Sequence, residues 1–186
     1  MAHNVQSKLD GDLMSKPVLI LFGTQSGNSE DLASQLAKSA TSHDLTPTVL
    51  DMDAANVEMM ASSERILIIC STWGEGEMPD SAEALWDSIN ADGVPKMEKT
   101  HFSVCALGDT SYEFFCQSGK DWDLKLEELG AKRVFARQDC DVDFDDSYAA
   151  WAAGALTAIS SVGGSVAEVV EESTEEESIE LSSEES

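Results

Sequence analysis

Basic residues are scarce in this sequence, which has 11 Lys and Arg against 36 Asp and Glu in 186 residues and a net charge of −25. This balance argues against a nucleic acid as partner, because nucleic acids are bound through Lys and Arg contacts to phosphate. An acidic surface keeps a protein soluble. Where the acids cluster, it also attracts a basic protein partner.

Cysteine and histidine are also rare. Cys70, Cys105, Cys116 and Cys140 include no C-x-x-C pair, and the three histidines lack metal-ligand spacing, so we expect no metal site. Two cysteines lie in apolar, strand-like runs, as buried reduced thiols of a cytoplasmic protein do. The sequence has neither the run of about 18 apolar residues that a membrane helix needs nor the apolar core of a signal peptide. We therefore expect a cytoplasmic protein without a membrane partner.

Apolar runs alternate with amphipathic segments through the middle of the chain. We expect strands at 17–23, 47–51, 65–71, 101–107 and 132–136, and helices at 29–42, 54–61, 81–90, after 119, and at the stripe of Tyr148, Trp151, Ala152, Ala155, Leu156 and Ile159. This alternation predicts an α/β fold, a parallel sheet with helices on both faces. Five strands suit the doubly wound order 2-1-3-4-5, with a ligand outside the carboxyl ends of strands one and three.

The two ends of the chain differ from this middle part. Residues 1–15 are polar and lack periodicity, so we expect a disordered N-terminal extension before one domain at 16–162. Residues 163–186 begin with two glycines, contain nine Glu and have no aromatic residue. Such a segment cannot bury enough apolar surface to fold, and we expect a disordered acidic tail or a linker.

The loop between the first strand and the first helix has the composition of a phosphate site. It contains no Lys, which excludes the Walker loop, and Gly23 and Gly27 lack the third glycine of the dinucleotide motif. What remains is an uncharged set of hydroxyl, amide and main-chain groups that suits a terminal monophosphate at a helix N-terminus: Thr24, Gln25, Ser26, Gly27, Asn28 and Ser29. The alternative is an ordinary helix cap by Ser26, Asn28 or Ser29.

Two further loops carry aromatic residues to the same edge of the predicted sheet. Trp73 lies among small residues and glycines in 71–80, and Tyr112 lies in 107–116. Glycine lets the backbone approach a flat ligand closely. Two aromatic side chains on adjacent loops can enclose a planar heterocycle beside the phosphate site.

The motifs Gly23-Thr-Gln-Ser-Gly-Asn, Ser71-Thr-Trp-Gly-Glu-Gly-Glu and Ala106-Leu-Gly-Asp-Thr-Ser-Tyr-Glu-Phe-Phe-Cys together resemble the flavodoxin-like FMN domain of diflavin reductases. That family includes NADPH–cytochrome reductases, nitric oxide synthase reductase domains and sulfite reductase flavoproteins. The segments from Gly119 and from Asp139 are most similar to the sulfite reductase branch. The resemblance spans roughly 16–162 and implies FMN as cofactor.

The resemblance implies a role for each matching residue. Thr24, Gln25, Ser26, Asn28 and Ser29 would hold the FMN phosphate, while Trp73 and Tyr112 would cover opposite faces of the isoalloxazine ring. The ring edge and the rest of the pocket would be framed by Thr72, Gly74, Gly76, Leu107, Gly108, Asp109, Phe115 and Cys116. One departure is Trp73, since this position is usually Tyr in these reductases.

The implied function is transfer of single electrons from an FAD/NADPH reductase domain or protein to a redox acceptor protein with a basic surface. The sequence shows no catalytic Ser-His-Asp or Cys-His set, and it stops before any FAD or NADPH domain, so no complete catalytic cycle is expected of the chain alone. The alternatives are a flavodoxin-like NAD(P)H-quinone reductase and a binding or regulatory module without flavin.

Acidic residues near the two aromatic loops would surround the ring edge: Glu75, Glu77, Asp80, Asp109, Glu113, Asp139, Asp141 and Asp143. Our hypothesis is that their field disfavours the anionic, reduced flavin. The flavin would then be a strong one-electron donor, and the same field would attract a basic acceptor.

Overall fold

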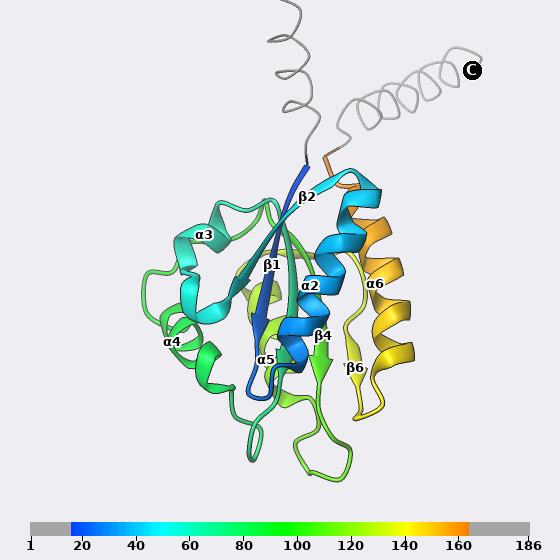
Figure 1. Cartoon of the computed structure of the whole chain (residues 1–186). Coiled ribbons are helices and arrows are strands. Elements are labelled where there is room, and N and C mark those ends of the chain that lie inside the picture. The colour runs from blue at the N-terminus through cyan, green and yellow to red at the C-terminus, as the bar shows by residue number, and fades with distance from the viewer. Residues whose placement is uncertain (1–15, 164–186) are drawn as a thin grey trace, which may run out of the picture.

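The computed structural model describes residues 16–163 and shows a parallel sheet between two layers of helices (Figure 1). The strands are β1 (Lys16–Gly23), β2 (Leu45–Asp51), β3 (Arg65–Ser71), β4 (His101–Leu107), β5 (Lys132–Arg133) and β6 (Gln138–Cys140). Their order is β2-β1-β3-β4-β5, with β6 also paired to β4, which confirms the predicted order. The predicted disorder of 1–15 and 163–186 lies outside the described residues, except for Gly163, which the structure describes.

Within residues 16–163, five α-helices cover the sheet: α2 (Asn28–Ala40), α3 (Val57–Ala61), α4 (Asp80–Ile89), α5 (Gln117–Glu128) and α6 (Asp145–Ser160). Short 3₁₀ turns follow α2 (η1, Thr41–His43) and β2 (η2, Met52–Ala54). Helices α2 and α6 pack on one face of the sheet, and α3, α4 and α5 pack on the other. The predicted apolar stripe of α6 is buried at all six positions.

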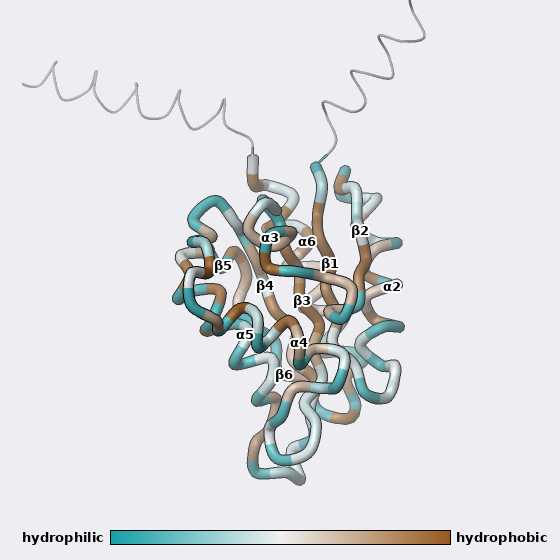
Figure 2. Tube along the Cα trace, turned by 90° about the vertical axis from the view of Figure 1, so that its left-hand side faces the viewer, coloured by the Kyte–Doolittle hydropathy of each residue, from teal (hydrophilic) through white to brown (hydrophobic). Residues whose placement is uncertain are grey.

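The central strands are apolar on both faces, as their sequences predict. Successive side chains of a strand point to opposite faces. Accordingly Leu67 and Ile69 of β3 pack against the α2 and α6 side, while Ile66 and Ile68 pack on the side of α3 to α5. Figure 2 shows these hydrophobic strands running through the middle of the molecule. The sheet is therefore held by two hydrophobic layers.

The fifth strand was predicted wrongly as one run at 132–136 followed by an acidic loop. The structure has two short strands, β5 and β6, each paired in parallel with β4. The break has a side-chain cause. The buried hydroxyl of Ser103 in β4 donates to the carbonyl of Phe135 (3.0 Å), and it accepts from the indole N–H of Trp151 in α6 (2.9 Å). A side chain thus takes the place of the main-chain ladder at this point.

Two arginines join this interrupted segment to α5. The buried carboxylate of Asp123 accepts from Nε of Arg133 (2.8 Å) and from an Nη atom of Arg137 (2.9 Å). A buried charge is tolerated where it is paired and hydrogen-bonded. Asp123 therefore holds the segment between β5 and β6 against the sheet.

The carboxyl ends of the strands lie at the lower end of Figure 1, where the loops after β1, β3 and β4 gather. The described part of the chain begins and ends at the opposite end, where Nζ of Lys16 donates to the carbonyl of Ser160 (2.8 Å). Of the helices in residues 16–163, none is long and apolar enough to cross a membrane. The geometry places the three motif loops together, away from both ends of the described chain.

Gly119 allows α5 to approach β4 closely, and its replacement by alanine tests this packing. A Cβ atom there would lie 2.2 Å from Cβ and 2.8 Å from Cα of Ala106. We expect Gly119→Ala to lower the free energy of unfolding by about 2–3 kcal/mol, as overpacking does, measured by urea denaturation.

Gly154 provides the matched control. The three atoms nearest to a Cβ atom at Gly154 all belong to the ring of Phe135, the far end of a half-buried side chain rather than backbone. Gly154→Ala should change stability by no more than about 1 kcal/mol, because alanine also favours the helix. Equal stability of the two variants would contradict the close approach at Gly119.

Candidate functional site

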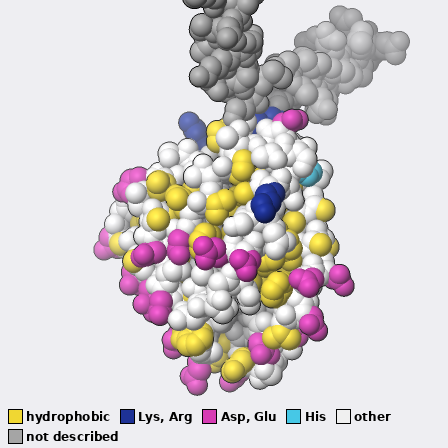
Figure 3. Space-filling model, viewed as in Figure 1, with side chains coloured by type: hydrophobic (Ala, Val, Ile, Leu, Met, Phe, Trp, Pro, Cys, Tyr) yellow, Lys and Arg dark blue, Asp and Glu magenta, His cyan; other side chains and the backbone are white. Residues whose placement is uncertain are grey.

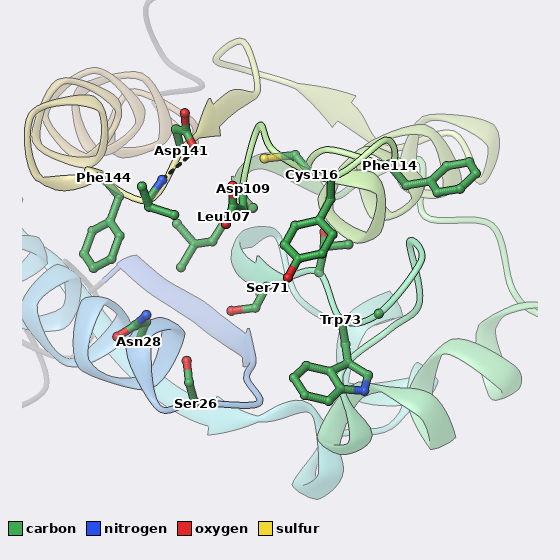
Figure 4. Close-up of a pocket in the computed structure, with 15 residues that line it drawn as sticks. Ser26, Asn28, Ser71, Trp73, Leu107, Asp109, Phe114, Cys116, Asp141 and Phe144 are labelled. Atoms are coloured by element: carbon green, nitrogen blue, oxygen red, sulfur yellow. Dashed lines mark hydrogen bonds between the residues drawn. The ribbon is translucent and has the colours of Figure 1, made fainter.

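A pocket of about 390 Å³ opens at the carboxyl ends of β1, β3 and β4 (Figure 4). Side chains from the start of α2, from the loops after β3 and β4 and from the segment after β6 surround it. Its described lining contains no Lys, Arg or His and comprises Ser26, Asn28, Ser71, Thr72, Trp73, Gly74, Leu107, Gly108, Asp109, Tyr112, Phe114, Cys116, Asp141, Val142 and Phe144.

One wall of the pocket is the N-terminus of α2. Gly27 precedes the helix with φ of +96°, a left-handed conformation that favours glycine, and its N–H donates to Oγ1 of Thr24 (2.8 Å). None of the described side chains caps this end of the helix. The predicted alternative, an ordinary side-chain cap, is therefore wrong. The N–H groups of the first turn remain available for an anion.

Some of the other residues of the predicted phosphate loop line the pocket, and the rest form hydrogen bonds that hold the loop in place. Ser26 and Asn28 line the pocket. Gln25 instead bonds to Asp80 at the start of α4, accepting from its N–H at 3.0 Å. Ser29 is buried, and its hydroxyl lies 2.7 Å from that of Ser71, which does line the pocket. Gln25, Ser29 and Thr24 thus position the loop in this structure.

Trp73 stands on a tight turn after β3. Its N–H donates to the carbonyl of Glu77 (2.9 Å), and the N–H of Glu77 donates back to Trp73 (2.8 Å). The indole is 51% exposed, an unusual state for so large an apolar side chain. Thr72 and Gly74 line the pocket, whereas Gly76, with φ of +102°, serves the turn outside the lining.

Tyr112 lies on the loop after β4 and is 64% exposed. This loop is tied to the segment after β6 by Asp141, whose carboxylate accepts from the N–H of Thr110 (3.0 Å) and from its hydroxyl (2.6 Å). The same carboxylate accepts from the N–H of Val142 (2.8 Å). These bonds, the one from the Thr110 hydroxyl first, hold the pKa of Asp141 below its ordinary value. The carboxylate is therefore charged at neutral pH.

Cys116 is the residue directly before α5 and lines the pocket, with φ of +57° and a fully buried side chain. Its thiol contacts the carbonyls of Ala106 (3.4 Å) and Cys140 (3.5 Å). Burial raises the pKa of this thiol to about 12. Cys116 is thus a neutral packing group rather than a nucleophile.

The structure adds five pocket residues that the motifs did not indicate as ligands: Ser71, Phe114, Asp141, Val142 and Phe144. Phe115, which the resemblance implied, lies outside the lining, next to Gly108 and below Nζ of Lys120. Val142 and Phe144 were missed because β6, which brings them to the pocket, was not predicted. Asp141 was foreseen only as an acid near the ring edge.

The pocket has the features of a cofactor-binding rather than a catalytic site. Within the described chain, no group of three or more His, Cys, Asp or Glu could hold a metal ion. The site combines the exposed aromatic side chains of Trp73, Tyr112 and Phe114, an uncapped helix and an uncharged set of donors.

The flavodoxin family profile matches residues 20–179 of the sequence. The chain belongs to the flavodoxin family. As a member it binds FMN, and the pocket fits this cofactor, with N–H donors at α2 for a phosphate and Trp73 and Tyr112 for a flat ring.

The curated relatives are larger proteins. The sulfite reductase (NADPH) flavoprotein alpha-component of Bacillus subtilis (strain 168) is 40% identical over 163 residues, covering 88% of this chain and 27% of that protein. The protein of the same name from Shewanella oneidensis is 39% identical over 84% of this chain and 26% of its own length. The chain thus spans about a quarter of the length of these relatives.

Solved structures support the fold. A flavodoxin mutant from Pseudomonas aeruginosa is 27% identical and superposes with a TM-score of 0.69 over 77% of this chain and 98% of its own. A flavodoxin from Streptococcus pneumoniae TIGR4, at 21% identity, superposes with a TM-score of 0.67 over 75% of this chain and 94% of its own. The second similarity concerns the fold alone.

Asp141→Asn tests whether the bonds to Thr110 hold the Tyr112 loop over the pocket. The amide loses one of the two acceptor oxygens, so we expect FMN affinity, measured by fluorescence titration, to fall about threefold to tenfold. In the wild type, the contribution of these bonds to FMN affinity is present at neutral pH and is lost only as the pH falls through the lowered pKa of Asp141.

Asp143→Asn is the control: it removes the same charge from an exposed neighbour and should bind FMN as the wild type does. Equal loss in both variants would indicate a charge effect instead.

Proposed function

We propose that this chain is an FMN electron-transfer module that receives electrons from an FAD/NADPH reductase domain or protein and passes them singly to a redox protein with a basic surface. The single observation that carries the proposal is the pair of exposed aromatic side chains, Trp73 and Tyr112, lining a pocket at the uncapped start of α2. Bound FMN supplies the one-electron chemistry, and the protein binds and orients it.

The phosphate would be held by the first-turn N–H groups of α2 together with the Ser26 hydroxyl and the Asn28 amide. An anion at this end is favoured by the helix dipole and needs no basic side chain. Ser29 would act indirectly, since its hydroxyl bonds to that of Ser71 beneath the pocket. Thr24 would keep the turn in place through the N–H of Gly27.

The ring would lie between the indole of Trp73 and the phenol of Tyr112. Both side chains stand on loops whose backbones are fixed, the first by the paired bonds between Trp73 and Glu77, the second by the bonds of Asp141 to Thr110. Gly74 and Gly108 also line the pocket, and the absence of a Cβ atom at Gly108 lets the main chain of Cys116 pack there, since its N atom would lie 2.7 Å from such a Cβ. Rigid support of this kind lowers the entropic cost of binding.

The relatives suggest the donor. Their names describe NADPH-dependent sulfite reductase flavoproteins, and this chain matches about a quarter of their length. By that similarity we propose that the electron donor is an FAD- and NADPH-binding unit, either a domain of the same polypeptide or a separate protein. The four free cysteines accord with a reducing compartment such as the cytoplasm.

Surface charge supports a basic acceptor. In Figure 3 the Lys and Arg side chains lie in the upper half of the view, while Asp and Glu extend to the lower end, where the pocket loops are. Glu75, Glu77, Glu113 and Asp143 are all exposed on these loops. Such a field speeds the encounter with a positively charged protein and weakens with salt.

Addition of FMN to the purified chain, followed by stepwise reduction, tests the proposal. We expect tight binding and an organic radical signal in electron paramagnetic resonance at half reduction, without steady NADPH oxidation by the chain alone. Steady NADPH oxidation by the chain alone would instead support the alternative function, that of a flavodoxin-like NAD(P)H-quinone reductase. Failure to take up FMN would support the other alternative, a binding or regulatory module without flavin.

Substitution of Trp73 tests the stacking role. Trp73→Ala should weaken FMN binding roughly tenfold to hundredfold, because it removes a large exposed aromatic surface, whereas Trp73→Tyr should stay within about threefold. The measurement is quenching of FMN fluorescence. Equal affinity of the alanine variant and the wild type would place the ring elsewhere.

The acidic loop residues can be tested together. Changing both Glu75 and Glu77 to Gln should raise the potential of the last reduction step and flatten the salt dependence of electron transfer to a basic acceptor. A matched control changes Glu58 and Glu98 to Gln, since both are exposed and lie outside the pocket lining. An unchanged potential would reject the tuning role, and a wild-type rate that does not vary with salt would reject the basic partner.

A further inference from the structure

Two cysteine thiols meet directly behind the pocket. The Sγ atoms of Cys105 in β4 and Cys140 in β6 lie 3.7 Å apart, and both side chains are fully buried. The two residues come from adjacent parallel strands, 35 positions apart in the sequence, and share the hydrophobic layer under α6. Their contact therefore depends on the fold and was not visible in the sequence.

The thiol pair is linked to the pocket by the main chain of Cys140. Its carbonyl accepts from the N–H of Gly108 (2.9 Å) and from the thiol of Cys116 (3.5 Å), two residues that line the pocket. The next residues along the chain include Asp141 and Val142, which also line it. A movement of Cys140 would therefore shift residues that line the pocket.

The two thiols are chemically unequal. The hydrogen bond between them, in which either sulfur can be the donor, raises the pKa of Cys105 and lowers that of Cys140. Thiolates are the reactive form of cysteine, so Cys140 is the better nucleophile and Cys105 the partner that resolves the oxidised sulfur.

We propose that Cys105 and Cys140 form a reversible disulfide that weakens FMN binding, so that the pair is a thiol redox switch behind the cofactor pocket. This goes beyond electron transfer by the flavin. The disulfide itself can be tested without reference to FMN.

The oxidant in this proposal is a peroxide. The Cys140 thiolate attacks one peroxide oxygen, the O–O bond breaks, and a sulfenic acid and one water form after protonation. The Cys105 thiol then attacks the sulfenic sulfur, and a second water leaves as the S–S bond forms. The two thiols lose two electrons and two protons in all, and hydrogen peroxide gains them as it becomes two waters.

Access to the buried pair requires a local opening, and β6 is suited to it. The strand has three residues and lies beyond β4 at the sheet edge, and its opening must break the ion pairs of Arg137 with Asp123 and Asp139. Short edge elements open more readily than the core does. We therefore expect oxidation to be slower than that of an exposed thiol pair.

Disulfide formation must change the position of β6. A bond of about 2.05 Å requires the two sulfur atoms to approach by roughly 1.7 Å. This approach strains the bond from Gly108 to Cys140 and shifts Asp141, which holds the Tyr112 loop. Because linkage is reciprocal, bound FMN should also disfavour the disulfide by the same factor.

The first experiment treats the reduced apo-protein with hydrogen peroxide, then denatures it and alkylates the remaining thiols. We expect two of the four cysteines to escape alkylation, peptide mapping to identify Cys105 linked to Cys140, and dithiothreitol to restore both. Cys105→Ala and Cys140→Ala should each abolish the linkage, and Cys70→Ala, on the other face of the sheet, should retain it. If a variant fails to fold, mapping of the wild-type protein decides the question.

The second experiment compares FMN affinity of the oxidised and reduced wild-type protein by fluorescence quenching. We expect oxidation to weaken binding roughly fivefold or more, with full recovery after reduction. Four alkylated thiols after peroxide treatment, or oxidation of Cys116 alone, would overturn the disulfide. A mapped disulfide with unchanged FMN affinity would overturn the switch.

Discussion

The uncapped N-terminus of α2 is the constraint on which the rest of the site depends. Gly27 turns the chain into the helix with a positive φ, and no described side chain caps the N–H groups of the first turn. An anion is the natural partner of such groups. The parallel order of β1, β3 and β4 places this turn beside the loops that carry Trp73 and Tyr112. The site for the FMN phosphate, the site for its ring and the acidic loop residues therefore lie together at one end of the molecule.

Much of this arrangement could be predicted, because the decisive signals are local. Strands β1, β3 and β4 are continuous apolar runs, and the stripe on α6 repeats at helical spacing, so their alternation predicted a parallel sheet, and five strands suited the doubly wound order. Trp73 and Tyr112 were recognisable from their glycine-rich and polar neighbours. The family resemblance then assigned the same loops to FMN, and the family membership of the chain agrees.

What the sequence could not show depends on contacts between distant residues. The break between β5 and β6 results from Ser103, which bonds to Phe135 and to Trp151 across the core. Because the sequence did not predict that break, the positions of the residues after β6 could not be predicted, and Val142 and Phe144 were missed as pocket residues. Gln25 bonds to Asp80 at the start of α4 rather than lining the pocket, for which no local pattern gives a signal. The contact of Cys105 with Cys140 depends on the same register.

Comparison of FMN with riboflavin by titration calorimetry tests the central claim most directly, because the two ligands share the ring and differ in the phosphate. If the first turn of α2 holds the phosphate, FMN should bind roughly a hundredfold more tightly, as several charge-assisted hydrogen bonds imply. Equal affinities would contradict the account, since the ring alone would then determine binding and the uncapped helix would have no part in it.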